Sequence, residues 1–315
     1  MKVLVKVLWK VDVYPDGVKP TGVTLYFFRD GKFYMQQTTS NVDSCVVQLD
    51  PGRYKLYMIS QSPEEYGTME FADMQDFDKA RVSVVETKSS WYTRADSEAL
   101  INSPELMVVG VSDEFEVSES LMEQYYRTAT KAGVDVYYYT ILVPVDPQCV
   151  TSQFWVTIYS DNADVLKSVR GSTTGMARTF NLTQGKTGDE EGTQLITQWT
   201  LTMDDPGRRV GHLDGYITTF GFPRGELPSA TRDSTLNVST LLVDNETVDH
   251  YVFNVGNLIT LDNPPPGYRS LYRLILGSVE APKIHPSHVD PPGDANGFVA
   301  TVSEWDEEEP VEVNM

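Results

Sequence analysis

The side chains best suited to metal or acid–base chemistry are four histidines: His212, His250, His285 and His288. His285 and His288 have the i, i+3 spacing that can hold a metal ion on a helix. Pro286 and the proline-rich surroundings disfavour a helix there, because proline lacks the N–H group that a helix requires. No third ligand accompanies the pair in the sequence. We therefore expect these histidines to lie in surface loops and predict no metal site.

Two acidic stretches, residues 161–164 and 189–192, could offer oxygen ligands to calcium. Neither stretch has the ligand spacing and the central glycine of an EF-hand loop. Asp, Asn and Gly also favour tight turns without any metal ion. Solvated turns are the simpler interpretation of both stretches.

Motifs for nucleophilic or phosphate chemistry are missing from the sequence. It contains no Gly-x-Ser-x-Gly elbow, no Walker A sequence and no dinucleotide glycine motif. We therefore predict no catalytic residues, no cofactor-binding residues and no enzymatic activity. Two carboxylates that meet only in space leave no sequence pattern, so a glycoside hydrolase stays a third alternative.

The two cysteines, Cys45 and Cys149, are far apart and show neither a disulfide framework nor zinc spacing. We expect each to be a small buried hydrophobic side chain. Asn-x-Ser/Thr tripeptides begin at Asn181, Asn237 and Asn245, and we interpret them as chance matches in threonine-rich strands.

Two tyrosine clusters, at residues 125–126 and 137–139, could form a stacking platform for sugars. Aromatic side chains also pack well in strands, which is the plainer interpretation. The clusters keep a surface glycan-binding module open as the alternative function.

Composition limits the partners. The 315 residues carry a net charge of −20, which would repel nucleic acids and anionic membranes. Part of this charge lies in an acidic end, residues 306–309 and 312. No apolar run is long enough to span a membrane.

The opening residues do not form a secretory signal, because Lys6 and Lys10 interrupt the apolar run; we expect any signal segment to lie outside this sequence.

Hydrophobic alternation of period two dominates the chain and predicts strands. The clearest example is residues 3–13, where every odd position is Val or Trp. Helical periodicity is almost absent, which argues against an α/β fold. Further strands are predicted at residues 23–28, 31–37, 45–49, 53–60, 80–88, 105–118, 134–145, 153–159, 193–203, 211–222, 235–243, 248–255 and 271–276, with residues 61–78 irregular.

Turn residues connect these strands. Asp30-Gly31 predicts a tight hairpin after Arg29, and Asp50-Pro51-Gly52 predicts a second one. Ser120 and Glu123 have capping-box spacing and favour one short helix over residues 121–131.

Chain length favours two domains, since 315 residues exceed one ordinary sandwich. Pro144 and Pro147 interrupt a β-rich segment, and we place the boundary there. The prediction is an all-β protein of two tandem β-sandwich domains, residues 1–145 and 146–315.

Several segments, in this order, resemble the fimbrillin-like surface lipoproteins of Bacteroidales. They are VKVLWKVDVYPDG, GVTLYFFRDG, LDPGRYKLYMIS, LITQWTLTMDD, HLDGYITTFGFP and the ending GFVATVSEWDEEEPVEVNM. The resemblance implies two transthyretin-like β-sandwich domains and attachment to the outer membrane or to a fimbrium through a lipid anchor outside this sequence.

Structural pilins of that group are cleaved after an arginine beyond the first strand and accept a donor strand from the next subunit. The first arginine here is Arg29, where cleavage would remove two strands rather than one. The resemblance therefore implies an accessory, tip or anchor subunit, or an adhesin, that contacts other fimbrial subunits or host and bacterial surface ligands. Residues 3–13, the best alternating strand, are the expected place for association.

Overall fold

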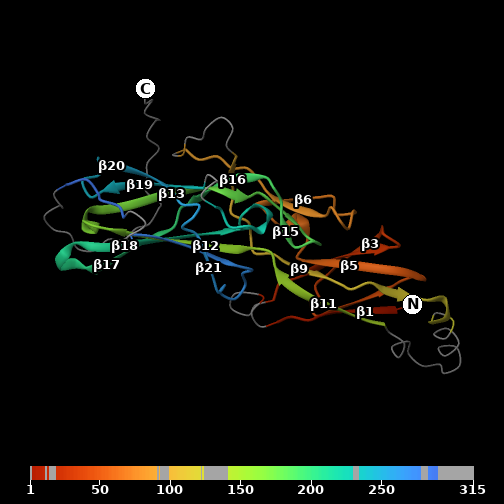
Figure 1. Cartoon of the computed structure of the whole chain (residues 1–315). Helices are drawn as coiled ribbons and strands as arrows, with labels where there is room; N and C mark the ends of the chain where they lie inside the picture. Colours follow the sequence, from red (N-terminus) through yellow and green to blue (C-terminus); the bar gives the residue numbers. More distant parts are fainter. Residues whose placement is uncertain are drawn as a thin grey trace.

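The computed structural model describes residues 2–10, 13, 19–90, 92, 99–121, 123, 141–229, 234–277 and 283–289. These residues form an all-β fold of 22 strands in four sheets, which confirms the predicted class. The molecule is elongated, with the N-terminal sheet at one end and two stacked sheets at the other (Figure 1). None of the helices in this part of the chain is long and apolar enough to cross a membrane.

The N-terminal sheet has eight strands. Seven form the order β3-β2-β5-β9-β11-β1-β4, and β10 pairs with β5. Their bounds are β1 Lys2–Val7, β2 Val23–Arg29, β3 Lys32–Thr39, β4 Ser44–Gln48, β5 Gly52–Ser60, β9 Val108–Val111, β10 Phe115–Val117 and β11 Ile141–Cys149.

This sheet curls until it nearly closes on itself. Val3 of β1 and Val143 of β11 bury into the same hydrophobic cluster as Leu25 of β2 and Leu56 of β5. Strands from both ends of the sheet can share one core only if the sheet bends around it. The opposite face of β2 and β5 packs against the larger core of the molecule through side chains such as Tyr57.

The first strand, β1, is an interior strand. It pairs in parallel with β11 and antiparallel with β4, so both of its edges are hydrogen-bonded. Val3, Val5 and Val7 point inward and are at most 5 % exposed, as the alternation predicts. The strand ends at Val7, six residues earlier than predicted; Trp9 is half-buried and donates its Nε1–H to the Val42 carbonyl at 2.9 Å.

One of the two predicted hairpins is confirmed. Asp30 and Gly31 take φ values of 49° and 78° and join the paired strands β2 and β3. The hairpin predicted at residues 50–52 is wrong, because β4 pairs with β1 while β5 pairs with β2, β9 and β10. The turn at Pro51 instead carries the chain from one side of the curled sheet to the other.

The other end of the molecule is a sandwich of two five-stranded sheets, visible as two layers in Figure 1. One layer has the order β17-β18-β12-β22-β21 and the other β20-β19-β13-β16-β8. Their bounds are β8 Leu100–Ile101, β12 Ser152–Ser160, β13 Leu166–Ala177, β16 Glu191–Ile196, β17 Trp199–Asp205, β18 Val210–Thr219, β19 Thr235–Leu242, β20 Val248–Asn254, β21 Thr260–Asp262 and β22 Leu271–Leu276.

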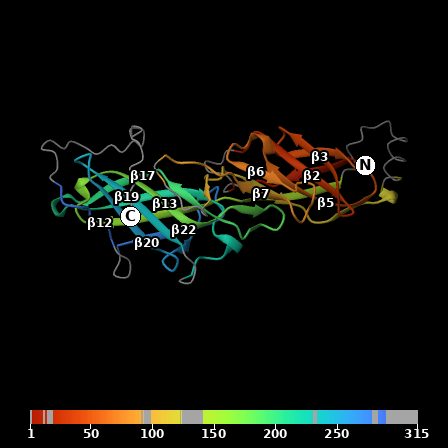
Figure 2. The same cartoon turned by 90° about the horizontal axis from the view of Figure 1, so that it is seen from above.

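A small fourth sheet, β15-β14-β7-β6, lies between the two ends (Figures 1 and 2). It pairs β6 (Met69–Ala72) and β7 (Arg81–Val84) with β14 (Thr179–Asn181) and β15 (Lys186–Thr187). Strand β6 lies within the stretch predicted to be irregular. Strand β8 likewise joins the sandwich by pairing with β16. Strands from both halves of the chain therefore share sheets.

Pro144 and Pro147 do not break the chain, contrary to the prediction. Strand β11 runs through both, with Pro144 opposite Lys6 and Pro147 opposite Gly110. Pro144 is exposed, whereas Pro147 is buried. The division into units 1–145 and 146–315 stays a prediction, and the shared sheets mean that any such units interlock.

The run predicted as one strand over residues 193–203 is two strands in different layers. β16 ends at Ile196 and β17 begins at Trp199, so the chain crosses the sandwich between them. Trp199 is buried and donates its Nε1–H to the Ile196 carbonyl at 2.9 Å.

The predicted short helix begins earlier than expected. Residues 119–121 are helical, and the Ser118 hydroxyl accepts a hydrogen bond from the Leu121 N–H at 3.3 Å. Ser118 rather than Ser120 is therefore the N-cap. Residues 124–131 lie outside the described residues.

Candidate functional site

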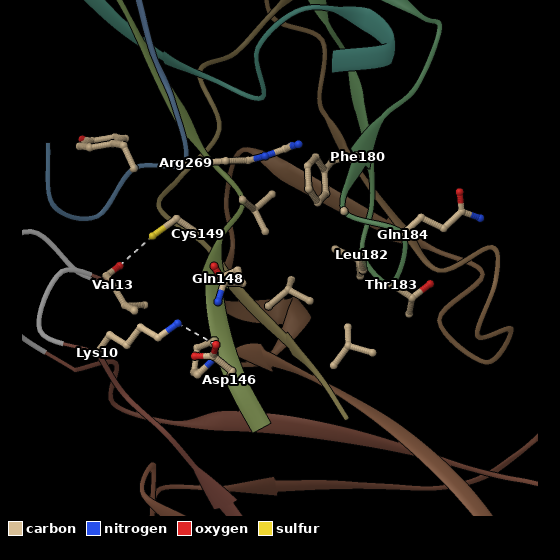
Figure 3. Close-up of a pocket in the computed structure, with 16 residues that line it drawn as sticks. Lys10, Val13, Asp146, Gln148, Cys149, Phe180, Leu182, Thr183, Gln184 and Arg269 are labelled. Carbon is tan, nitrogen blue, oxygen red and sulfur yellow. Dashed lines mark hydrogen bonds and ion pairs between the residues drawn. The ribbon is translucent and has the colours of Figure 1, made fainter. Parts of the chain in front are cut away.

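A cavity of about 540 Å³ lies where the curled sheet meets the strands of the second half of the chain. One wall comes from the end of β11, including Gln148 and Cys149. The loop after β14, residues 182–185, forms the facing wall, and Arg269 closes one side (Figure 3). The site thus exists only because the two halves of the chain pack together.

The charged groups of this cavity contact other side chains of the chain. Lys10 Nζ lies 2.7 Å from Asp146 Oδ2, and the Arg269 guanidinium stacks 5.1 Å from the centre of the Phe180 ring. The Cys149 thiol donates to the Val13 carbonyl at 3.0 Å (Figure 3). No histidine is among the described residues that line the cavity, so the thiol has no imidazole base beside it there. The lining therefore combines paired or stacked charged groups with apolar side chains such as Val109, Val150 and Leu182.

A second feature is an aromatic surface on the sandwich, which we call the outer aromatic face. It is the outward side of β18, β12 and β22 and comprises Trp155, Tyr159, Tyr216 and Ile275, which are 39 %, 39 %, 48 % and 44 % exposed. The alternate residues of β12, Phe154, Val156 and Ile158, are buried in the core as predicted. Outward sheet positions are normally polar, so a cluster of large apolar side chains there is informative.

The structure does not bring the four histidines together. His212 Nδ1 lies 2.8 Å from Asp204, His250 Nδ1 lies 2.8 Å from the Ser239 hydroxyl, and His285 Nδ1 lies 3.1 Å from Asp161. His285 and His288 are exposed and outside regular helix or strand, as predicted. Within the described ranges, no group of three or more His, Cys, Asp or Glu side chains is arranged to hold a metal ion.

The carboxylates of the two acidic stretches form ion pairs with Arg and Lys side chains of the same chain. Both oxygens of Asp164 lie 2.8 Å from Arg209 Nε, and Asp189 lies 2.6 Å from Arg224 Nε. Asp161 contacts Lys283 at 2.7 Å. These carboxylates close turns, as the simpler interpretation expects.

The cysteines and the three tripeptide asparagines occupy structural positions. Cys45 is buried on β4, and this burial raises the pKa of its thiol; Cys149 is only half-buried. Asn181 Oδ1 accepts the N–H of Gln184 at 2.7 Å, and Asn237 donates to Ser172 at 3.3 Å. Asn245 accepts a hydrogen bond from Lys167 in a turn.

The tyrosine clusters at residues 125–126 and 137–139, and the acidic end, lie outside the described residues. Sequence reasoning missed the outer aromatic face. The signal was present: in the alternating strands QFWVTIY and HLDGYITT, aromatic residues occupy positions between the buried ones. Large apolar side chains at the outward-facing positions of a strand, where polar residues are expected, could have identified the face.

The all-β fold is similar to that of solved structures from Bacteroides. A candidate adhesin of Bacteroides ovatus has a TM-score of 0.56 at 16 % identity, over 93 % of this chain and 94 % of that one. A candidate adhesin of Bacteroides thetaiotaomicron has a TM-score of 0.51 at 10 % identity, over 80 % and 79 %. The fimbrial anchor protein Mfa2 of Porphyromonas gingivalis reaches 0.48 at 11 % identity, over 87 % and 89 %, which is too low to support an inference.

The particular family follows from sequence. The chain belongs to DUF5119, a domain family of unknown function, whose pattern matches residues 1–197. No curated protein matches the sequence.

Proposed function

We propose that this chain is a fimbrillin-like cell-surface protein that acts by contact. It serves as an adhesin, or as an accessory, tip or anchor subunit of a fimbrium, and binds other subunits or host and bacterial surface ligands. The observation that carries this proposal is the position of β1. Because β1 is hydrogen-bonded to both β11 and β4, the N-terminal sheet keeps its own first strand. A sheet that is complete in this way contacts its partners through its surface rather than by exchanging that strand.

Two further observations support a binding role. The cavity beside Cys149 pairs or stacks its charged groups instead of presenting them to a substrate. The overall fold is shared with Bacteroides proteins described as candidate adhesins. We infer a non-enzymatic protein.

The finer points of the fold and location belong to the same proposal. The two ends of the molecule are transthyretin-like β-sandwich units, residues 1–145 and 146–315, interlocked through β6, β7 and β8. The protein is an outer-membrane lipoprotein or fimbrial component held by a lipid anchor outside this sequence, and the net charge of −20 keeps it away from nucleic acids.

A surface glycan-binding module is the second candidate function. One specific observation favours it, namely the outer aromatic face on β12 and β18.

Adhesion of protein-coated beads tests the main proposal. Beads carrying the full chain should bind epithelial cells, bacterial cells or purified fimbrial subunits more than beads carrying the heat-unfolded chain. Electron microscopy and sizing, before and after treatment with an arginine-specific protease, should show no self-polymerisation. Binding to none of the three targets would overturn the proposal. Fibres that appear after proteolysis would instead assign the chain to the stalk of the fimbrium.

A further inference from the structure

Strand register brings the side chains of the outer aromatic face into neighbouring rows. Trp155 of β12 lies opposite Tyr216 of β18 and next to Arg273 of β22. The ring centres of Trp155 and Tyr216 are 6.4 Å apart with a 43° angle between planes, and the Arg273 guanidinium lies 5.7 Å from the Trp155 ring. Farther along the same two strands, Tyr159 lies opposite His212, with the ring centres 5.6 Å apart.

Polar groups fill the spaces between the rings. Asp214 lies between the Tyr216 and His212 positions on β18 and accepts a hydrogen bond from the Thr157 hydroxyl at 2.6 Å. Trp155 Nε1–H donates to Gln153 at 2.9 Å, which fixes the indole orientation. The face therefore combines held aromatic rings with hydrogen-bonding side chains on both sides of them.

This combination matches a carbohydrate better than a protein surface. Interface cores between proteins are depleted in aspartate, whereas Asp214 lies among the rings here. A sugar ring has an apolar C–H face that can stack on an indole or phenol ring and hydroxyl groups that pair with carboxylate, amide and guanidinium groups.

The charge of the face selects against acidic glycans. Asp214 lies on it, Asp204 lies 2.8 Å from His212, and Asp262 lies 3.8 Å from Arg273. The carboxylates offset the positive charge of Arg273, and the chain as a whole carries −20. A polyanion such as heparin would be repelled.

We propose that the outer aromatic face binds a neutral glycan, with sugar rings stacked on Trp155 and Tyr216 and hydroxyl groups bound by Asp214 and Arg273. This site deepens the proposed function, on which it rests, by giving the adhesive surface a chemical class of ligand. Cross-strand pairing alone would also bring aromatic side chains together, but it predicts an effect on stability and none on binding.

Titration of the full chain with cellohexaose, xylohexaose, maltohexaose and mannohexaose, followed by tryptophan fluorescence and calorimetry, tests the site. At least one neutral oligosaccharide should bind, and heparin should not. Trp155→Ala should weaken binding by about tenfold, the effect of removing one stacked ring. Asp214→Asn should weaken it by about threefold to tenfold through the loss of one good hydrogen-bond acceptor.

Val252→Ala is the matched control, because Val252 is 71 % exposed on β20 of the other layer. This variant should bind like the wild type, and circular dichroism should show all three variants folded. Failure of every neutral oligosaccharide to bind, or equal binding by Trp155→Ala, would overturn the site. Bead adhesion by the Trp155→Ala chain separates the two proposals: if adhesion persists without glycan binding, the site fails and the adhesive function stands.

Discussion

At the scale of single residues, two glycines set how closely the sandwich layers pack around Trp199. A Cβ atom at Gly171 would lie 2.7 Å from the indole, and one at Gly215 would lie 2.8 Å from it. Contacts under 3 Å force either the ring or the backbone to move. The small residues therefore allow β13 and β18 to hold the indole between them.

We predict that Gly215→Ala destabilises the protein by about 1–3 kcal/mol, the usual effect of overpacking a core. Gly67→Ala is the control, because the nearest atom to a Cβ there is 4.0 Å away. Urea unfolding followed by tryptophan fluorescence measures both. Equal stability of the two variants would show that the space around Trp199 is not tight.

Cys45 gives a second prediction at this scale. It is 8 % exposed, and burial raises the pKa of its thiol, so the reactive thiolate is scarce at neutral pH. In a Cys149→Ser chain, Cys45 should react with iodoacetamide much more slowly than a free thiol at pH 8. Labelling should become fast in urea. Fast labelling of the folded chain would contradict the burial of β4 against the inner core.

At the scale of elements, the alternation of β1 places Val5 inside the curled sheet and Lys6 outside it. Val5→Asp should destabilise the protein by more than about 3 kcal/mol, because an unpaired charge would enter the core. Lys6→Thr should change stability by less than about 0.5 kcal/mol, since its site is exposed. Thermal unfolding compares them, and similar losses for both would mean that β1 is not seated as described.

Strands in which apolar and polar residues alternate could be predicted from the sequence, but β13 could not. This strand, Leu166–Ala177, is central in its layer, yet half of its sequence LKSVRGSTTGMA is polar and two further residues are glycines. Its neighbours β19 and β16 bury it, so packing rather than alternation makes it a strand. The pairing of strands could not be predicted from the sequence either. The turn at residues 50–52 has the sequence of a hairpin, but the curling of the sheet pairs β4 with β1 and β5 with β2, β9 and β10.

At the scale of the whole molecule, the two halves of the chain share sheets and one continuous core. Phe28 and Tyr57 belong to the same buried cluster as Phe154 and Phe222. The cavity beside Cys149 and the pairing of β7 with β14 both depend on this packing, and no local sequence pattern encodes it. The outer aromatic face, by contrast, could have been found from the phase of its strands.

Interlocking halves should not fold separately. A fragment of residues 146–315 lacks β8, β7 and β6, so it should show a weak near-UV circular dichroism signal and bind a hydrophobic dye. Co-expression with residues 1–145 should restore the signal. A fragment that folds alone with a cooperative transition would show that strand sharing contributes little to stability.

β1 is hydrogen-bonded on both sides within the N-terminal sheet, and we infer that it stays there while the chain acts through its surface. Amide hydrogen exchange of the full chain, measured over residues 2–7, tests it most directly. We predict that these amides exchange as slowly as those of β12 in the sandwich core, because both strands are hydrogen-bonded on each side. Exchange of residues 2–7 as fast as that of an exposed loop would contradict it, since β1 would then be free to leave its sheet.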